Sequence, residues 1–436
     1  MKMSINPSAF ETIEPSRYIT FTIPIGPASR RHLLRIAVLD SPAVTVGDAA
    51  AAMWVPQGRE SDWIFSTFSG HLHLLLSSPT SPPLSRLILI SDSKLYARRP
   101  RHASSVRPNV APLLLALTPK SAFLDDGGVP EIPFLVYEDE VVTGSILETC
   151  EGPCVGEMLI ENVELRKDDS SIVREFRRRL RFKRMPNLVQ TQMRIRPKTE
   201  SVCEELDDME FELDEDVLVH PYLSPMVAGI SVISSCLEER IQDGFRPKVL
   251  CLGVGGGALI GFLNKKLNFE VVGVEIDVVV SEVAKRYFGL GNNELIHLHV
   301  GDGIEFLRDL ATKADGMFDV IMVDLDSCDA SMGSYAPPME FVQKPVLLAA
   351  RDLLRETGVL VTNTIPSSES FHGRLISEFQ QVFEELYEID VENEENLVLV
   401  ATKSRTESCF DSRSDAFLNK LKLYIPSSHM DSMRKI

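Results

Sequence analysis

The second half of the chain alternates between short apolar runs and longer segments with helical spacing. The apolar runs occupy residues 248–253, 270–277, 295–302, 318–326 and 358–365, and a segment with helical spacing follows each of them. Short apolar runs predict buried strands, and apolar positions repeated every three or four residues predict amphipathic helices. The alternation therefore predicts an α/β domain with a parallel sheet and helices on both faces.

Two further apolar runs close this pattern. Residues 386–391 and 396–402 are separated by only a few positions, too few for the crossover that joins parallel strands. They are therefore predicted to form an antiparallel hairpin after the last helix. At the other end of the domain, an amphipathic helix over residues 220–241 is expected to begin at Pro221 or Pro225.

The first half has a different pattern. Short β-like runs broken by proline and glycine extend from about residue 17 to residue 198, and residues 176–184 and 188–195 predict two strands around a turn. The next segment, residues 204–216, holds nine acidic side chains and predicts a flexible linker. We therefore expect a β-rich domain (1–200), an acidic linker (201–217) and an α/β domain (218–436).

Charge and composition narrow the function classes. The formal net charge of -18 over 436 residues argues against a general nucleic-acid binder and favours a basic partner. Residues 174–184 nevertheless hold seven basic side chains, which form either a solvated sheet face or a docking surface. Seven scattered cysteines without a CxxC pair predict neither a disulfide framework nor a metal site. Without a signal-peptide pattern or a membrane-length apolar run, we expect a cytoplasmic protein.

A glycine cluster follows the first strand of the α/β domain. Residues 249–263 read VLCLGVGGGALIGFL, in which Gly253, Gly255 and Gly257 allow a ligand to approach the backbone where a helix begins. The spacing does not match a P-loop, which excludes that mode of nucleotide binding. Both NAD(P) and S-adenosylmethionine are compatible with this turn.

Three features favour S-adenosylmethionine. Glu275 ends the second strand, where a carboxylate can accept both ribose hydroxyls of either ligand. Asp302, followed by Gly303, ends the third strand, where it can bind the exocyclic amine of adenine, and this fits S-adenosylmethionine better. The closing hairpin is expected of the seven-stranded, Rossmann-like fold of S-adenosylmethionine-dependent methyltransferases rather than of dinucleotide-binding folds. Helix capping is the alternative role for both carboxylates, and it is the preferred role for Asp277.

The fourth strand ends in a loop rich in carboxylates. Residues 323–338 read VDLDSCDASMGSYAPP, in which Asp324 and Asp326 are the candidate catalytic residues and Asp324 is also a candidate donor contact. Methyl transfer to an amine requires an oriented, unprotonated nucleophile, and carboxylates can bind an ammonium group and help relay its proton. Asp329 is interpreted as a turn residue. Two further candidates for the pocket lie elsewhere in the chain: Tyr222 and Asn363.

These motifs resemble a known family. The runs GVGGG, VVGVEID, HVGDGIEF and FDVIMVDLDSCDASMGSYAPPMEFV resemble the C-terminal domain of the elongation factor 1-alpha lysine and N-terminal methyltransferases. HPYLSPMVAGIS at 220–231 resembles the segment that enters this domain, and VPQGRESDWIF at 55–65 resembles the region between the two catalytic domains of that family. The resemblance extends from about residue 17 to residue 436.

The resemblance implies a cofactor, a partner and roles for several residues. The wider group is similar in fold to spermidine synthases, and in this family the C-terminal domain methylates the N-terminal α-amine of the elongation factor. A lysine-directed N-terminal domain has no counterpart here, which leaves open whether the chain is a truncated form. By motif match, Gly253, Gly255, Glu275 and Asp302 are implied to contact S-adenosylmethionine, and Asp324 is implied to face the acceptor.

Three functions are compatible with these patterns. The leading hypothesis is a protein methyltransferase that modifies an α-amine or lysine, with elongation factor 1-alpha as the expected partner. The alternative is an aminopropyltransferase of the spermidine-synthase type, although Leu325 and Asp326 interrupt the carboxylate-serine pattern of those enzymes after the fourth strand. The third is a non-catalytic scaffold, either cofactor-binding or degenerate, in which the basic run at 174–184 acts as a binding module.

Overall fold

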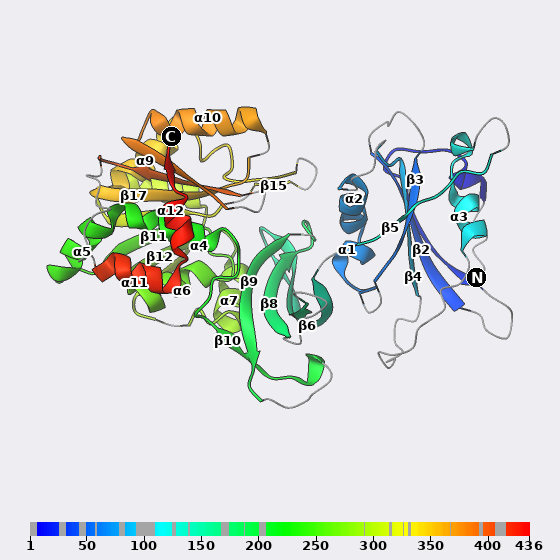
Figure 1. Ribbon diagram of the computed structural model, residues 1–436, viewed down its shortest axis with the longest axis horizontal. Helices are drawn as coiled ribbons and strands as arrows, with labels where there is room; N and C mark the ends of the chain where they lie inside the picture. The colour runs from blue at the N-terminus through cyan, green and yellow to red at the C-terminus, as the bar shows by residue number, and fades with distance from the viewer. Residues whose placement is uncertain are drawn as a thin grey trace. The chain divides into compact units, whose positions relative to one another are not determined.

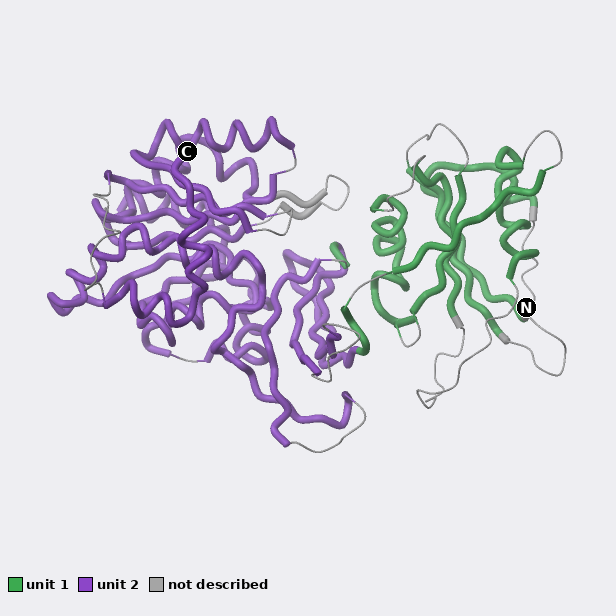
Figure 2. Tube along the Cα trace, viewed as in Figure 1, with its two compact units in different colours: residues 1–143, 185–187 green, residues 144–184, 188–436 purple. Residues whose placement is uncertain are grey.

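The chain folds into two compact units, which Figure 2 distinguishes by colour. The computed structural model describes residues 7–25, 32–42, 49–56, 59–77, 83–92, 110–123, 128–137, 140–166, 174–186, 188–199, 206–291, 293–313, 316–325, 327–329, 333–366, 368–391, 396–405 and 416–436. The first unit comprises residues 1–143 and 185–187, and the second comprises residues 144–184 and 188–436. The division therefore falls near residue 143, and most of residues 144–200, predicted to belong to the first domain, lie in the second unit.

The first unit is a mixed sheet between two layers of helices. Its strands run in the order β1 (Tyr18–Ile25), β2 (His32–Asp40), β4 (Arg86–Asp92), β3 (Ala50–Trp54) and β5 (Phe134–Leu135). Helices α1 (Trp63–Ser66) and α2 (Phe68–Leu76) cover one face, and α3 (Ala111–Leu117) covers the other (Figure 1). A fully buried ion pair joins the Arg86 Nε and Asp40 Oδ1 atoms at 2.6 Å and fixes the end of β4 to the end of β2.

The second unit begins with a small sheet. Its strands run in the order β10 (Phe211–Asp214), β9 (Val189–Pro197), β8 (Glu175–Phe182), β7 (Gly156–Leu165) and β6 (Val141–Gly152). The predicted pair of strands around a turn is confirmed, because β8 and β9 pair antiparallel. The prediction of a flexible linker is wrong where β10 forms. Phe211 packs against Phe176 there, and the Asp214 carboxylate accepts hydrogen bonds from two arginines of β9.

The basic side chains of β8 are largely compensated within this sheet. Arg181 forms an ion pair with Glu161 of β7 at 2.8 Å, and Arg178 donates a hydrogen bond to Asn162 of the same strand. Arg177 forms an ion pair with Glu175 at 2.8 Å. Arg177 and Arg181 are therefore already paired with carboxylates of this sheet.

The large sheet of the second unit has the predicted architecture. Its strands run in the order β13 (Ile296–Val300), β12 (Glu270–Glu275), β11 (Lys248–Leu252), β14 (Phe318–Val323), β17 (Leu354–Thr364), β19 (Leu397–Thr402), β18 (Glu385–Asp390) and β20 (Arg434–Lys435). The first five strands are parallel, and β19 is antiparallel to both β17 and β18. The predicted seven-stranded methyltransferase-type sheet with its closing hairpin is therefore confirmed. The short edge strand β20 adds an eighth strand that the sequence did not predict.

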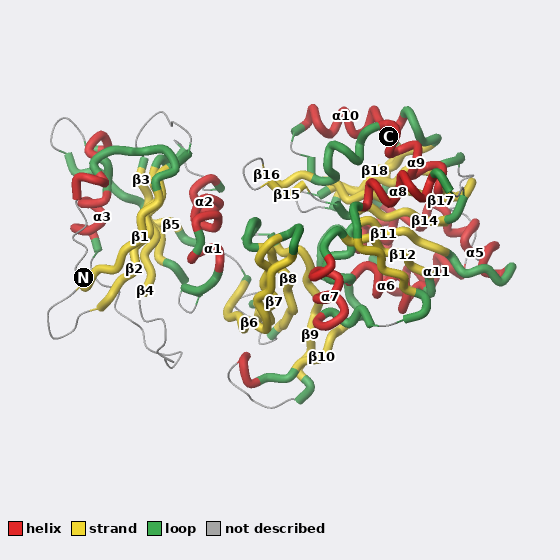
Figure 3. Tube along the Cα trace, turned by 180° about the vertical axis from the view of Figure 1, so that it is seen from behind, coloured by secondary structure: helices red, strands yellow, loops and turns green. Residues whose placement is uncertain are grey.

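Helices cover both faces of this sheet (Figure 3). On one face lie α4 (Leu223–Ala228), α5 (Ser234–Gln242), α6 (Ala258–Leu267), α11 (Ala416–Tyr424) and α12 (Ser427–Asp431). On the other face lie α8 (Gly303–Ala311), α9 (Lys344–Leu353) and α10 (Glu369–Gln380). The single helix predicted over residues 220–241 is interrupted, because a 3-10 segment, Gly229–Ile233, separates α4 from α5. None of the helices in the described ranges is long and apolar enough to span a membrane.

Helix α7 (Val278–Tyr287) joins the small sheet to the large one. Its Val280 and Val283 side chains pack in one buried cluster with Leu180 and Phe182 of β8. The Arg178 side chain also donates a hydrogen bond of 2.9 Å to the Tyr287 carbonyl oxygen. These contacts hold the β8–β9 hairpin beside the carboxyl ends of the parallel strands, where open α/β sheets bind their ligands.

Candidate functional site

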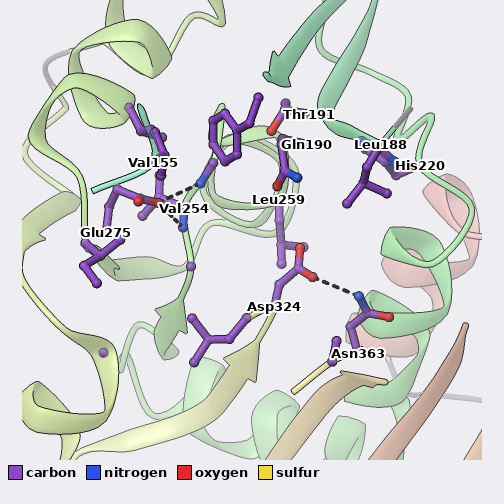
Figure 4. A pocket seen from close by; sticks show the side chains of 18 of the residues that line it. Val155, Leu188, Gln190, Thr191, His220, Val254, Leu259, Glu275, Asp324 and Asn363 are labelled. Atoms are coloured by element: carbon purple, nitrogen blue, oxygen red, sulfur yellow. Dashed lines mark hydrogen bonds between the residues drawn. The ribbon is translucent and has the colours of Figure 1, made fainter. Parts of the chain in front are cut away.

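A cavity of about 660 Å³ lies at the carboxyl ends of the parallel strands, within the second unit (Figure 4). Ligand sites for small molecules fall in the same size range. The segments that line it come from the strand ends, from the β8–β9 hairpin and from the approach to α4. Its polar and glycine lining includes Gly253, Gly255, Glu275, Asp302, Gly303, Asp324, Asn363 and Asn396 from the large sheet, and Arg184, Gln190, Thr191, Gln192, His220 and Tyr222 from the other segments.

The glycine turn between β11 and α6 packs closely against two other segments of the chain. Gly253 has a φ of +85°, and a Cβ atom there would lie 2.2 Å from the Asp324 carbonyl oxygen. A Cβ atom on Gly255 would lie 2.8 Å from Thr191 Oγ1, which also accepts a hydrogen bond of 2.7 Å from the Gly256 N–H. Because Gly253 and Gly255 have no side chains, Asp324 after β14 and Thr191 of β9 can approach the backbone of the turn closely. The same two glycines also line the cavity. Gly257 is not part of the cavity lining, and a Cβ atom there would meet Leu290.

Glu275 connects the glycine turn to the end of β12. Its Oε2 atom accepts hydrogen bonds of 3.1 Å from the Val254 and Gly255 N–H groups, and Oε1 accepts one of 3.2 Å from the Asp277 N–H group. Burial raises the pKa of this carboxyl above its usual range, although these three N–H groups act in the opposite direction. Glu275 thus lines the cavity and holds the glycine turn in place.

Asp302 and Asp277 both cap helices, but only Asp302 lines the cavity. The Asp302 Oδ1 atom accepts hydrogen bonds from the Ile304 and Glu305 N–H groups at the start of α8. Its carboxylate is exposed, and Gly303 beside it also lines the cavity. The preferred role of Asp277 as a cap is confirmed: it caps α7 and also accepts two hydrogen bonds from the turn after β6.

Asp324 lies directly after β14 and is held by hydrogen bonds from two other segments. Tyr222 Oη donates to Asp324 Oδ2 at 3.2 Å, and Asn363 Nδ2 donates to Asp324 Oδ1 at 2.9 Å. Asn396 Nδ2 in turn donates to Asn363 Oδ1 at 2.9 Å. Figure 4 shows Asp324 and Asn363 facing each other across the hydrogen bond that joins them. The structure thus brings together Asp324, Tyr222 and Asn363, which the sequence singled out separately, while Asp326 lies outside the described residues.

Sequence reasoning missed several residues of this cavity, among them Thr191, Asn396 and His220. Thr191 comes from β9, and Asn396 comes from the start of the closing hairpin. His220 lies two positions before Tyr222, so its proximity to that tyrosine was the one signal that the sequence offered. Its side chain is 8% exposed, and burial, with Arg177 and Arg179 nearby, lowers its pKa to about 3.

The cavity therefore has two chemically different edges. One edge, formed by the glycine turn, Glu275 and Asp302, offers backbone and carboxylate groups suited to a nucleoside. The other edge offers the Asp324 carboxylate, which is suited to an amine. No group of three or more His, Cys, Asp or Glu side chains within the described ranges is arranged to hold a metal ion.

Comparison with known proteins finds similarity to methyltransferases and to aminopropyltransferases. Residues 241–402 match the family described as the spermine/spermidine synthase domain. The chain is 26% identical over 427 residues to the eEF1A lysine and N-terminal methyltransferase of Xenopus laevis, which covers 93% of this chain and 58% of that protein. It is also 27% identical over 198 residues to the polyamine aminopropyltransferase of Vibrio vulnificus, which covers 44% of this chain and 58% of that protein.

A solved structure of human methyltransferase-like protein 13 in complex with SAH also matches, with 25% identity and a TM-score of 0.40. The match covers 49% of this chain and 94% of that chain. The resemblance inferred from the motifs is thus confirmed as a similarity that extends over most of the chain. The chain spans little more than half the length of the curated relatives named here.

Proposed function

We propose that the chain is a methyltransferase that transfers a methyl group from S-adenosylmethionine to an amine of a protein, either an N-terminal α-amine or a lysine. The observation that carries the proposal is the position of Asp324, whose hydrogen-bonded carboxylate shares a cavity with the glycine turn and Glu275. Similarity to the eEF1A lysine and N-terminal methyltransferases supports elongation factor 1-alpha as the substrate. With a substrate in the translation machinery, the proposed activity is cytoplasmic.

The nucleoside edge fits the proposed donor. Gly253 and Gly255 bring backbone to the cavity without side chains, and Glu275 is placed to accept the ribose hydroxyls. Asp302 uses Oδ1 for capping, which leaves Oδ2 to accept the exocyclic amine of adenine. When bound, S-adenosylmethionine supplies an electrophilic methyl group on a sulfonium. The -18 net charge of the chain also suits a basic protein partner.

Asp324 is the residue that binds the acceptor amine in this proposal. Its carboxylate binds the incoming ammonium group and orients the nitrogen, and it helps to pass on the proton that the nitrogen must lose before attack. Tyr222 and Asn363 each donate to one carboxylate oxygen and so fix the plane of the group. With that plane fixed, the amine is held in one direction rather than in several.

Aminopropyl transfer is the second candidate function. The match of residues 241–402 to the spermine/spermidine synthase domain and the similarity to a polyamine aminopropyltransferase both favour it. The same carboxylate at Asp324 would then bind a polyamine, and the donor would be decarboxylated S-adenosylmethionine. The two candidates therefore share a site and differ in both substrates.

Radioactive labelling of a cell extract tests the proposal. The purified chain is incubated with methyl-labelled S-adenosylmethionine and the extract, and the labelled protein and site are identified by mass spectrometry. Label on an amine of elongation factor 1-alpha, lost in Asp324→Asn and kept in the surface control Asp309→Asn, is the expected result. Donor binding without any labelled protein would reject the proposal and direct the assay to putrescine with the decarboxylated donor. A chain that does not bind the donor would be a scaffold.

A further inference from the structure

His220 brings unused hydrogen-bonding capacity to the cavity. The side chain precedes α4 and is 8% exposed, and its Nε2 atom has no hydrogen-bond partner within the described part of the chain. It lines the cavity on the wall that also carries Leu188 (Figure 4). A buried polar group without a partner costs about 1–3 kcal/mol, so such groups in a binding cavity call for a ligand that satisfies them.

The imidazole belongs to the amine edge of the cavity rather than to the nucleoside edge. Its ring centroid lies 5.3 Å from that of Tyr222, and Tyr222 Oη donates the 3.2 Å hydrogen bond to Asp324. One aromatic ring therefore separates the histidine from the carboxylate. An acceptor whose amine binds Asp324 would reach His220 by extending along the Tyr222 ring.

The imidazole is neutral at physiological pH, since burial lowers its pKa to about 3, and Arg177 and Arg179 act in the same direction. It therefore does not repel an ammonium group at Asp324. A neutral imidazole has one N–H donor and one acceptor nitrogen. In the tautomer with its N–H on Nε2, the imidazole can donate to a carbonyl oxygen, and no described residue supplies that oxygen to His220 Nε2.

The candidate acceptors differ in what lies next to the amine. An N-terminal α-amine is separated from a peptide carbonyl oxygen by only one Cα atom and the carbonyl carbon. A lysine side-chain amine or a polyamine amine is attached to a run of methylene groups instead. We infer that His220 donates a hydrogen bond to the first carbonyl oxygen of the acceptor and thereby selects an N-terminal α-amine. This inference rests on the proposed methyltransferase function.

Acceptor analogues test this role. The first acceptor is a synthetic peptide with the N-terminal sequence of elongation factor 1-alpha and its lysines acetylated. The second is the same peptide with a methylene in place of its first carbonyl, and the third is an N-acetylated peptide with one free lysine. Each is assayed with the wild type, His220→Ala, His220→Asn and the control His297→Ala, which replaces an exposed histidine of β13.

The expected result is a loss of about tenfold in kcat/KM for the first peptide in His220→Ala, as one hydrogen bond to the acceptor is removed. The methylene analogue should be equally slow with the wild type and His220→Ala, because neither can make the bond. His220→Asn keeps an N–H donor and should recover part of the rate. His297→Ala should match the wild type, and calorimetry with S-adenosylhomocysteine should show unchanged donor binding in every variant.

Other outcomes separate this inference from the proposed function. An equal loss for the peptide and its methylene analogue would overturn the inference, because His220 would then only support Tyr222. No loss for the first peptide would also overturn it. A wild type that methylates the lysine peptide and not the first would reject α-amine selection while leaving amine methylation intact. A wild type that methylates neither would reject the proposed function itself.

Discussion

The two edges of the cavity are held in place by different kinds of interaction. On the nucleoside edge, Glu275 and Asp302 accept hydrogen bonds from backbone N–H groups of the glycine turn and of α8. On the amine edge, Asp324 is held by the side chains of Tyr222 and Asn363, and Asn363 is held by Asn396. Backbone donors come with the fold, whereas a chain of side chains can be altered one residue at a time. We therefore expect substitutions at the two edges to affect donor binding and acceptor chemistry separately.

The largest effect is expected at Asp324. Asp324→Asn keeps the size of the side chain and removes its charge, so the amine loses the group that binds it and helps to pass on its proton. We expect kcat/KM for the protein acceptor to fall by about 10²–10⁴-fold. The affinity for S-adenosylhomocysteine, measured by calorimetry, should stay close to that of the wild type. If kcat/KM of Asp324→Asn stayed within tenfold of the wild-type value, Asp324 would not be the group that binds the acceptor amine.

Glu275→Gln should affect the donor instead. The amide presents an NH₂ group where the Val254 and Gly255 N–H groups now meet Oε2, or turns it toward the Asp277 N–H. One donor then faces another, and a carboxylate for the ribose hydroxyls is lost. We expect affinity for S-adenosylhomocysteine to fall by about 30–100-fold. At saturating donor, kcat should recover most of its value, and a kcat that stays low would place Glu275 in the chemical step.

The sequence predicted the residues of the site that lie at strand ends. Gly253, Glu275, Asp302 and Asp324 each follow a strand that the apolar pattern marks, so their meeting at one edge of the sheet could be expected. The parallel strands of the large sheet and its closing hairpin followed from the same pattern. Local periodicity was therefore sufficient for the sheet and for the residues at its strand ends.

The residues that the sequence did not predict come from contacts between distant segments. Thr191 reaches the glycine turn only because β8 packs on α7, and Asn396 reaches Asn363 only through the pairing of β19 with β17. The misassigned linker has the same cause. Charge density over residues 204–216 indicated disorder, but β9 supplies both the backbone pairing and the arginines that compensate Asp214.

His220 on the amine edge and Glu275 on the nucleoside edge should change the free energy of unfolding in opposite directions as the pH is varied. His220 has a folded pKa of about 3, below its unfolded value, so the unfolded chain binds more protons between about pH 3 and 6.5 and stability falls as the pH falls through that window. For Glu275 the folded pKa is raised, so its contribution is present at low pH and lost as the pH rises. The two groups therefore act on stability in opposite directions as the pH falls.

His220→Gln isolates this contribution. Between pH 7 and pH 5, the unfolding free energy of the wild type should fall by about 2 kcal/mol more than that of the variant. Urea denaturation at both pH values measures the difference, and the other histidines are common to both chains. Parallel losses in the two proteins would show that His220 is accessible to protons in the folded state.

The smallest effect should come from the end of the amine edge, at Asn396. Its Nδ2 group donates to Asn363 Oδ1 and so directs Asn363 Nδ2 toward Asp324. In Asn396→Asp, a carboxylate attracts that Nδ2 group, and Asn363 then turns its oxygen toward Asp324. Asp324 loses the Asn363 donor and gains a repulsive neighbour, so kcat should fall by about tenfold. Asn396→Ser, which keeps a hydroxyl donor, should fall less, and an unchanged kcat in the aspartate variant would show that the carboxylate is held without the bond from Asn363.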